Sequence, residues 1–147
     1  MKITYKGDYA LKAVLELALN HGNGSIITIH DLAKRLDIPI KFLEQVLLDL
    51  KRGGYVAARR GKLGGYFLAK SPATIKVGEI IRLIEGPVEP IACTNEEYSG
   101  CKDIYKCVFR GIWQDVAKAT SDIIDNITFE YLVNRTARQS MSVNYQI

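Results

Sequence analysis

The feature that most constrains the fold is a pair of helices joined by a tight turn in the N-terminal half of the chain. Thr28 stands three residues before Asp31, a spacing related to the capping box that opens a helix, and this helix is expected to reach Leu36. Residues 37–39 form a tight turn, whose proline suits the first position of a further helix that continues to about Arg52. Two helices in this relation predict a helix-turn-helix.

Two short β-prone runs follow directly on this motif. Residues 55–58 and 66–69 carry aromatic and apolar side chains, and they flank the glycine-containing turn of residues 59–65. Such a pattern predicts a β-hairpin. A hairpin directly after a helix-turn-helix is a wing. The sequence therefore predicts a mainly α fold with a small β-hairpin wing, a winged helix-turn-helix.

Further helices are predicted on both sides of this unit. Apolar residues at helical spacing over residues 8–20 indicate a first helix, which the glycines of residues 22–24 end. A fourth helix is expected over residues 77–85, before a Gly-Pro pair at residues 86–87. The third helix is expected to turn one apolar stripe toward the core, formed by Phe42, Leu43, Val46, Leu47 and Leu50.

The domain division follows from these elements and from a second apolar pattern. Residues 1–87 are expected to form the winged helix-turn-helix domain, and residues 88–103 a loop. Residues 104–133 are expected to hold a long dimerisation helix with one more helical turn near its end, and residues 134–147 a polar, disordered tail. The helix carries apolar residues at a 4-3-4-3-4 spacing, namely Tyr105, Phe109, Ile112, Val116, Ala119 and Ile123. This heptad seam favours pairing with the same helix of a second subunit over packing on its own domain.

The basic charge is concentrated in the first half of the chain. Residues 1–70 hold twelve Lys and Arg against six Asp and Glu, whereas residues 71–147 hold eight against ten. A basic half with a helix-turn-helix favours binding to double-stranded DNA over a merely solvated surface. The third helix suits base edges in the major groove, and the wing suits phosphates and the minor groove. The candidate DNA contacts are Thr28, Lys41, Phe42, Glu44, Gln45, Arg59, Arg60 and Lys62.

All three cysteines of the chain, Cys93, Cys101 and Cys107, fall within fifteen residues. Their odd number fits a disulfide framework poorly. Their intervals of seven and five residues are wider than a zinc knuckle prefers, and they suit a loop around a larger inorganic centre. An iron–sulfur cluster is therefore favoured, with zinc and redox-active thiols as alternatives. Charged neighbours that offer oxygen ligands or offset the charge of a cluster are Glu96, Glu97, Lys102, Asp103, Lys106 and Arg110.

Four motifs in the same order resemble the Rrf2 family of bacterial regulators. They are residues 6–11 (KGDYAL), residues 42–45 (FLEQ), the wing residues 60–66 (RGKLGGY) and residues 78–81 (GEII). The resemblance extends over about residues 1–133. It implies a homodimeric winged-helix protein that binds DNA and pairs through a long helix. It also implies that Glu44 or its neighbours read bases and that Arg60 enters the minor groove.

The same resemblance bears on the cysteines, which match the cluster ligands of the sensing branch of the family; the cysteine-metabolism branch looks cluster-free. The first interval is two residues longer than is usual there, and Arg110 replaces a histidine that follows the third cysteine in one branch. Arginine stays protonated and is no metal ligand, so the fourth ligand is open. Resemblance to the nitric-oxide-sensitive branch implies Asp8, reaching across the dimer, although Asp8 is also placed to cap the first helix.

Taken together, these patterns predict a homodimeric repressor that binds a palindromic operator. Its DNA binding would depend on a 2Fe-2S or 4Fe-4S cluster that responds to iron, redox state or nitric oxide. The alternative is a regulator of the same fold without a cluster, controlled by a partner protein or by thiol oxidation. No phosphate-binding loop or nucleophile elbow indicates an enzyme. No signal peptide or membrane span is expected, so the sequence predicts a cytoplasmic protein.

Overall fold

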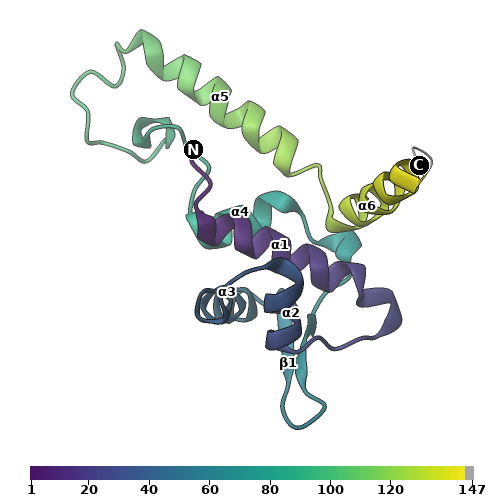
Figure 1. Ribbon diagram of the computed structural model, residues 1–147. Coiled ribbons are helices and arrows are strands. Elements are labelled where there is room, and N and C mark those ends of the chain that lie inside the picture. The colour runs from purple at the N-terminus through teal and green to yellow at the C-terminus, as the bar shows by residue number, and fades with distance from the viewer. Residues whose placement is uncertain (145–147) are drawn as a thin grey trace.

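The computed structural model describes residues 1–144 of the chain and places a winged-helix body beside two further helices (Figure 1). The body contains α1 (Tyr5–Leu19), α2 (Ile29–Leu36), α3 (Ile40–Arg52), β1 (Val56–Arg59), β2 (Gly65–Leu68) and α4 (Val77–Glu85). The two helices that follow are α5 (Val108–Ile124) and α6 (Phe129–Asn144). Short 3-10 turns lie at His21–Asn23 (η1), Pro72–Thr74 (η2) and Ala92–Thr94 (η3). The predicted fold class is confirmed.

Side-chain caps fix where the first helices begin. The Thr28 hydroxyl accepts a hydrogen bond from the backbone N–H of Asp31 at 3.1 Å, and so caps α2 as the sequence predicts. Helix α1 begins at Tyr5, earlier than the expected residue 8, because Thr4 caps it by accepting from the Gly7 N–H. Pro39 is the residue before α3 and not its first residue.

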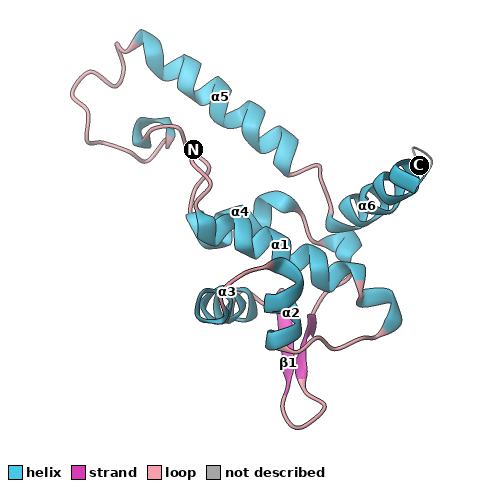
Figure 2. Ribbon diagram, in the orientation of Figure 1, coloured by secondary structure: helices cyan, strands magenta, loops and turns pink. Residues whose placement is uncertain are grey.

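The wing is a two-stranded antiparallel hairpin in which Val56 pairs with Leu68 and Arg59 with Gly65 (Figure 2). Ile27 extends it by one bridge, since Ile27 and Tyr66 exchange backbone hydrogen bonds at 2.7 and 3.0 Å. A side chain at Gly65 would bring its Cβ within 2.5 Å of the Ile27 carbonyl oxygen. This close approach ties the base of the wing to the segment that precedes α2.

The core lies between α1, α3, the hairpin and α4. Four of the five predicted core residues of α3 are buried, namely Leu43, Val46, Leu47 and Leu50. The prediction for the fifth was wrong, because Phe42 is 62% exposed. Phe42 lies about a quarter turn outside the buried stripe, on the flank of α3, because successive helical residues are rotated by about 100°.

The C-terminal part of the chain differs most from expectation. Residues 134–147 were predicted to be a disordered tail, but α6 continues to Asn144, and residues 145–147 lie outside the described part of the chain. Helix α6 is anchored because Phe129 is fully buried in the body and Leu132 and Val133 pack against the same core. Tertiary packing of its first turns supports a helix whose polar sequence gives little sign of one.

Helix α5 projects away from the body, on the side opposite the wing (Figures 1 and 2). It contains no buried residue, although its sequence carries the apolar seam. The helix begins at Val108, so Tyr105, the first predicted seam residue, precedes it and is 95% exposed.

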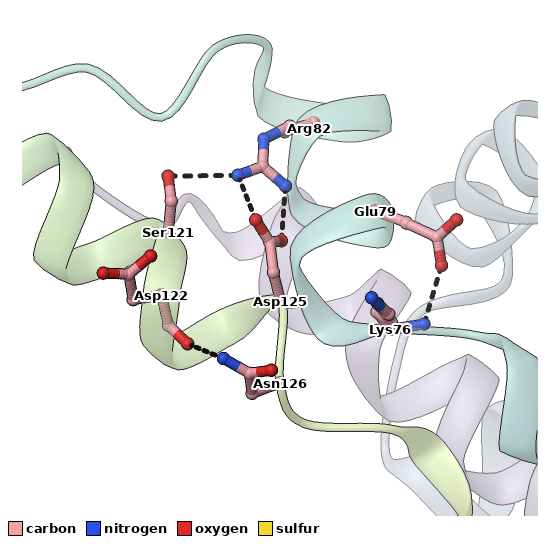
Figure 3. A network of polar contacts seen from close by, with 7 residues as sticks. All are labelled: Lys76, Glu79, Arg82, Ser121, Asp122, Asp125 and Asn126. Carbon is pink, nitrogen blue, oxygen red and sulfur yellow. Dashed lines mark hydrogen bonds and ion pairs between the residues drawn. The ribbon is translucent and has the colours of Figure 1, made fainter.

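One polar cluster joins α5 to the body (Figure 3). The Arg82 guanidinium on α4 donates to both carboxylate oxygens of Asp125, at 2.6 and 3.0 Å, and to the Ser121 hydroxyl at 3.1 Å. This bidentate geometry is the strong form of an arginine–carboxylate pair, and it fixes orientation as well as distance. Together with the backbone hydrogen bonds that join residues 127 and 129 to residues 77 and 75, the junction sets the direction in which α5 leaves the body.

The same pair shifts the pKa values of both partners. The hydrogen bond from Arg82 holds the pKa of Asp125 below its ordinary value of 3.8, and that bond raises the pKa of Arg82. A carboxyl whose pKa is lowered on folding stabilises the protein above its unfolded pKa. That stabilisation is complete at neutral pH and is lost only as the pH falls below about 3.8.

Gly78 permits this junction, and its replacement tests it. A Cβ at Gly78 would overlap the Asp125 carboxylate and would lie 2.8 Å from Arg82 Nη1. We expect Gly78→Ala to lower the free energy of unfolding by about 1–2 kcal/mol in urea denaturation, although alanine is the better helix former. The matched control is Gly111→Ala on α5, where a Cβ meets no atom within 4 Å. The control should be neutral or stabilising, and equal effects at the two sites would contradict the role of Gly78.

Candidate nucleic-acid interface and cysteine segment

Helix α3 presents its predicted base-reading residues on the face opposite the core. Lys41, Glu44 and Gln45 are exposed, while the buried residues of the helix lie on the other side. Phe42 is exposed beside them and lines a hollow with Tyr5, Tyr9 and Gln45. Thr28 is half-buried, and its hydroxyl caps α2. The first turns of α3 thus offer a cation, a carboxylate, an amide and an aromatic ring on one surface.

The wing carries three exposed cations, Arg59, Arg60 and Lys62. Gly61, at φ 109°, occupies the left-handed region that favours glycine, and it tightens the turn between Arg60 and Lys62. None of the three cations enters an ion pair within residues 1–144. They are therefore available to phosphate oxygens.

Cations elsewhere on the body are partly neutralised. Lys6 lies 2.5 Å from Asp49, and Arg35 lies 2.9 Å from Glu16. Intramolecular pairing weakens the attraction of these two cations for a phosphate backbone. The cations of the wing, like Lys41 on α3, have no such partner within residues 1–144.

The cysteine segment, residues 86–107, lies between α4 and α5, far from the wing (Figure 1). Cys93 is half-buried in η3, whereas Cys101 and Cys107 are exposed, and all three thiols are free. Cys107 is the residue that precedes α5. Within residues 1–144, no three His, Cys, Asp or Glu side chains are gathered so as to hold a metal ion. The single chain brings the three thiols onto one segment but does not assemble them into a centre.

Asp8 lies in the first turn of α1 and pairs with Lys12 at 2.7 Å. This hydrogen bond raises the pKa of Lys12. The alternative role of Asp8 as the helix cap is excluded because Thr4 is the cap. The Asp8 carboxylate lines an open hollow of about 590 Å³ together with Lys2, Ile3 and Tyr5.

Two arginines contribute in ways that sequence reasoning missed. Arg82 forms the junction with α5, and its partner Asp125 lies 43 residues away. Arg110 Nε donates to the Cys93 carbonyl oxygen at 2.8 Å. A second stripe at heptad spacing on α5, formed by Arg110, Gln114 and Ala117, was the sequence signal for the side of α5 that faces its own chain. In the structure these three residues are half-buried, while the apolar seam is exposed.

Comparison with known families agrees with this arrangement. Residues 3–135 match the model of the family described as "Rrf2: Iron-dependent Transcriptional regulator". The chain belongs to the Rrf2 family. The match includes the winged-helix body, the cysteine segment and α5.

Relatives of this Rrf2 protein are similar over most of their length. The "Putative HTH-type transcriptional regulator rrf2-like" of Rhodobacter capsulatus is 39% identical over an alignment of 134 positions, which covers 87% of this chain and 89% of that protein. The HTH-type transcriptional regulator IscR of Erwinia tasmaniensis is 36% identical, over 91% of this chain and 79% of the relative. The relatives are transcriptional regulators and not enzymes.

Two solved structures share the fold. CymR, the global cysteine regulator of B. subtilis, superposes with a TM-score of 0.76 at 31% identity, over 92% of this chain and 98% of CymR. IscR of T. potens superposes with a TM-score of 0.74 at 30% identity, over 92% of this chain and 88% of that one. The protein is therefore a winged-helix transcriptional regulator that binds DNA. Within residues 1–144, no helix has the length and apolar character needed to cross a bilayer.

The wing assignment is tested by Arg60→Ala. We expect this variant to weaken operator binding by about 1–3 kcal/mol in a fluorescence anisotropy titration, because one unpaired cation leaves the DNA surface. The control is Arg138→Ala, which removes an exposed arginine from α6, away from the wing. Equal operator affinity of Arg60→Ala and the parent protein would show that the wing does not contact DNA.

Proposed function

We propose that the protein is a homodimeric repressor whose grip on a palindromic operator is controlled by an iron–sulfur cluster on Cys93, Cys101 and Cys107. The observation that carries this proposal is the position of the three free thiols, which lead directly into a projecting helix with an exposed apolar seam. The family description as iron-dependent regulators supports it. The protein would act in the cytoplasm.

The dimer would form through α5. Phe109, Ile112, Val116 and Ile123 are between 43% and 63% exposed, and they repeat at heptad spacing. Such a seam is typical of helices that pair with a second helix, because burying it removes apolar surface from water. Paired α5 helices would place two winged-helix bodies about one axis, which suits a palindromic operator.

Ile112→Asp tests this interface. A carboxylate in the seam would be buried without a partner, so we expect monomers by light scattering and a loss of cooperative operator binding. Lys118→Glu is the control, because Lys118 lies on another side of α5 with its side chain 74% exposed. A stable dimer in Ile112→Asp would exclude pairing through this seam.

Sequence would be read by α3 and the wing. Gln45 suits adenine, Glu44 accepts from cytosine, and Lys41 donates to guanine. Phe42 offers an apolar contact of the kind that fits a thymine methyl group. Arg60 would enter the minor groove while Arg59 and Lys62 contact phosphates, and Thr28 would contribute from the start of α2.

The donor set fits an iron–sulfur cluster by its chemistry, since three thiolates are the ligands such clusters prefer. When bound, a cluster supplies a redox- and ligand-sensitive iron centre. The three thiols come from one segment, so a fourth ligand has to come from elsewhere. Asp8 is the proposed fourth ligand, reaching across the dimer, and its position on the lining of an open hollow supports this role.

Coupling from the cysteine segment to the reading surface would run through α5. The segment leads into α5 at Cys107, and α5 meets α4 at the Arg82–Asp125 junction. In the same last turn of α4, Glu85 holds the start of α1, because it accepts from the backbone N–H and the hydroxyl of Thr4 at 2.8 and 2.6 Å. A change in the cysteine segment would therefore reorient the winged-helix bodies relative to each other.

Anaerobic purification tests the cluster. We expect a coloured protein with matched iron and sulfide, and we expect Cys101→Ala to lose both while Ser99→Ala keeps them. Both residues are exposed, so neither change should disturb the fold. The cluster-bound and cluster-free forms should differ in operator affinity by about 1–3 kcal/mol. Asp8→Ala should change the spectrum or the lifetime of the cluster if Asp8 is a ligand.

The alternative function has a distinct outcome in the same experiment. A colourless, iron-free protein that binds its operator specifically would favour control by a partner protein or by thiol oxidation. Two observations keep this alternative in view, since the thiols are not gathered within residues 1–144 and the fold is shared with the cysteine regulator CymR. Treatment with peroxide, followed by operator binding, would then separate thiol control from partner control.

A further inference from the structure

The cysteine segment is attached to α5 at its first cysteine, Cys93. Arg110, in the first turn of that helix, donates from Nε to the Cys93 backbone carbonyl oxygen at 2.8 Å. The two residues lie 17 positions apart in the chain. Cys93 is half-buried at this contact, whereas Cys101 and Cys107 are exposed.

The turn that carries Cys93 is also fixed from within. The Thr94 hydroxyl donates to the Ile91 carbonyl at 2.8 Å, and the Asn95 N–H donates to the Ala92 carbonyl at 3.1 Å. The turn η3 is therefore a small preformed unit. Arg110 joins this unit to α5 by a hydrogen bond from a charged donor, which is stronger than one between neutral groups.

The face of α5 that carries Arg110 continues the contact along the helix. Gln114, Ala117 and Ser121 follow at helical spacing, and they line a hollow with Thr94 and Val88 of the cysteine segment. This stripe lies on the side of α5 away from the apolar seam. The helix can thus hold the Cys93 turn on one side while the seam stays free for a second subunit.

Arginine is suited to holding the Cys93 turn in place, and it is not suited to binding the metal itself. Its guanidinium stays charged, so it is not a ligand. Its Nε–H donates to the Cys93 backbone carbonyl oxygen, a bond in which the thiol takes no part. The contact therefore acts on the position of Cys93 and leaves its sulfur available.

We propose that Arg110 is a positioning residue that holds the Cys93 turn against α5 before any metal centre is present. One of the three thiols is then prepositioned at the base of the dimerisation helix, and only the exposed part of the segment, residues 95–106, has to close around a cluster. The effect on a cluster rests on the proposed function; the effect on Cys93 in the metal-free protein does not.

The first experiment measures the alkylation rate of each cysteine in the reduced, metal-free protein, by iodoacetamide labelling and peptide mass spectrometry. Arg110→Ala should raise the rate at Cys93 about fivefold, the change that corresponds to losing a hydrogen bond worth about 1 kcal/mol. The rates at Cys101 and Cys107 should stay within about twofold, because both thiols are already exposed. Arg110→Lys keeps a donor and a positive charge, and it should restore part of the protection.

Lys106→Ala is the matched control, because it removes an exposed cation from the same segment without touching Cys93. A loss of charge alone would change all three rates in Arg110→Ala and in Lys106→Ala alike. An unchanged Cys93 rate in Arg110→Ala would overturn the proposal. A uniform rise in both variants would overturn it as well.

The second experiment separates this inference from the proposed function. In protein reconstituted with iron and sulfide, Arg110→Ala should lose its visible absorbance several-fold faster than the parent under a chelator. If Cys93 is deprotected but neither protein ever holds iron, Arg110 positions Cys93 and the proposed cluster is wrong. If both proteins hold a cluster with equal lifetimes, the proposed effect of Arg110 on the cluster is wrong.

Discussion

The direction in which α5 leaves the body depends on the ion pair between Arg82 on α4 and Asp125 at the end of α5, together with the backbone hydrogen bonds that join residues 127 and 129 to residues 77 and 75. The body and α5 share little other surface, since α5 contains no buried residue. A bidentate arginine–carboxylate pair fixes an angle as well as a distance, which a single apolar contact would not do. The close approach is possible because Gly78 has no side chain at the point where Asp125 meets α4. A strong and directional contact therefore helps to set where the projecting helix points.

Different sides of helix α5 make different contacts. One side carries the exposed apolar seam, and another holds the Cys93 turn through Arg110 and meets α4 through Ser121. A rigid helix that contacts both a cysteine segment and the winged-helix body is suited to carry a local change over a long distance. The winged-helix body itself is ordinary in its packing, and its candidate DNA-contacting residues lie mostly on exposed positions of α3 and the wing. Under the proposed function, regulation acts through the contacts that α5 makes with the body and with the cysteine segment, and not through the core.

Much of the fold could be predicted because its signals are local. The Thr28 cap, the apolar stripe of α3 and the glycine-containing turn of the wing each act within a few residues, so the sequence indicates them directly. Phe42 was misplaced because a stripe assigned by residue type ignores the angle at which each side chain leaves the helix. Helix α6 was predicted as a single turn, and its extent to Asn144 was missed because its polar sequence is supported by the packing of Phe129 in the core.

The sequence by itself determined the winged helix-turn-helix, the unequal distribution of basic residues and the presence of three thiols on one segment. It also determined the family, through motifs that recur in order. Only the tertiary structure decided that Arg82 meets Asp125, that Arg110 holds the Cys93 carbonyl, and that the wing cations stay unpaired while Lys6 and Arg35 do not. The physical reason is how far apart in the sequence the interacting residues lie. Caps, turns and periodicity depend on neighbouring residues, whereas these contacts join residues that only the packing of the helices brings together.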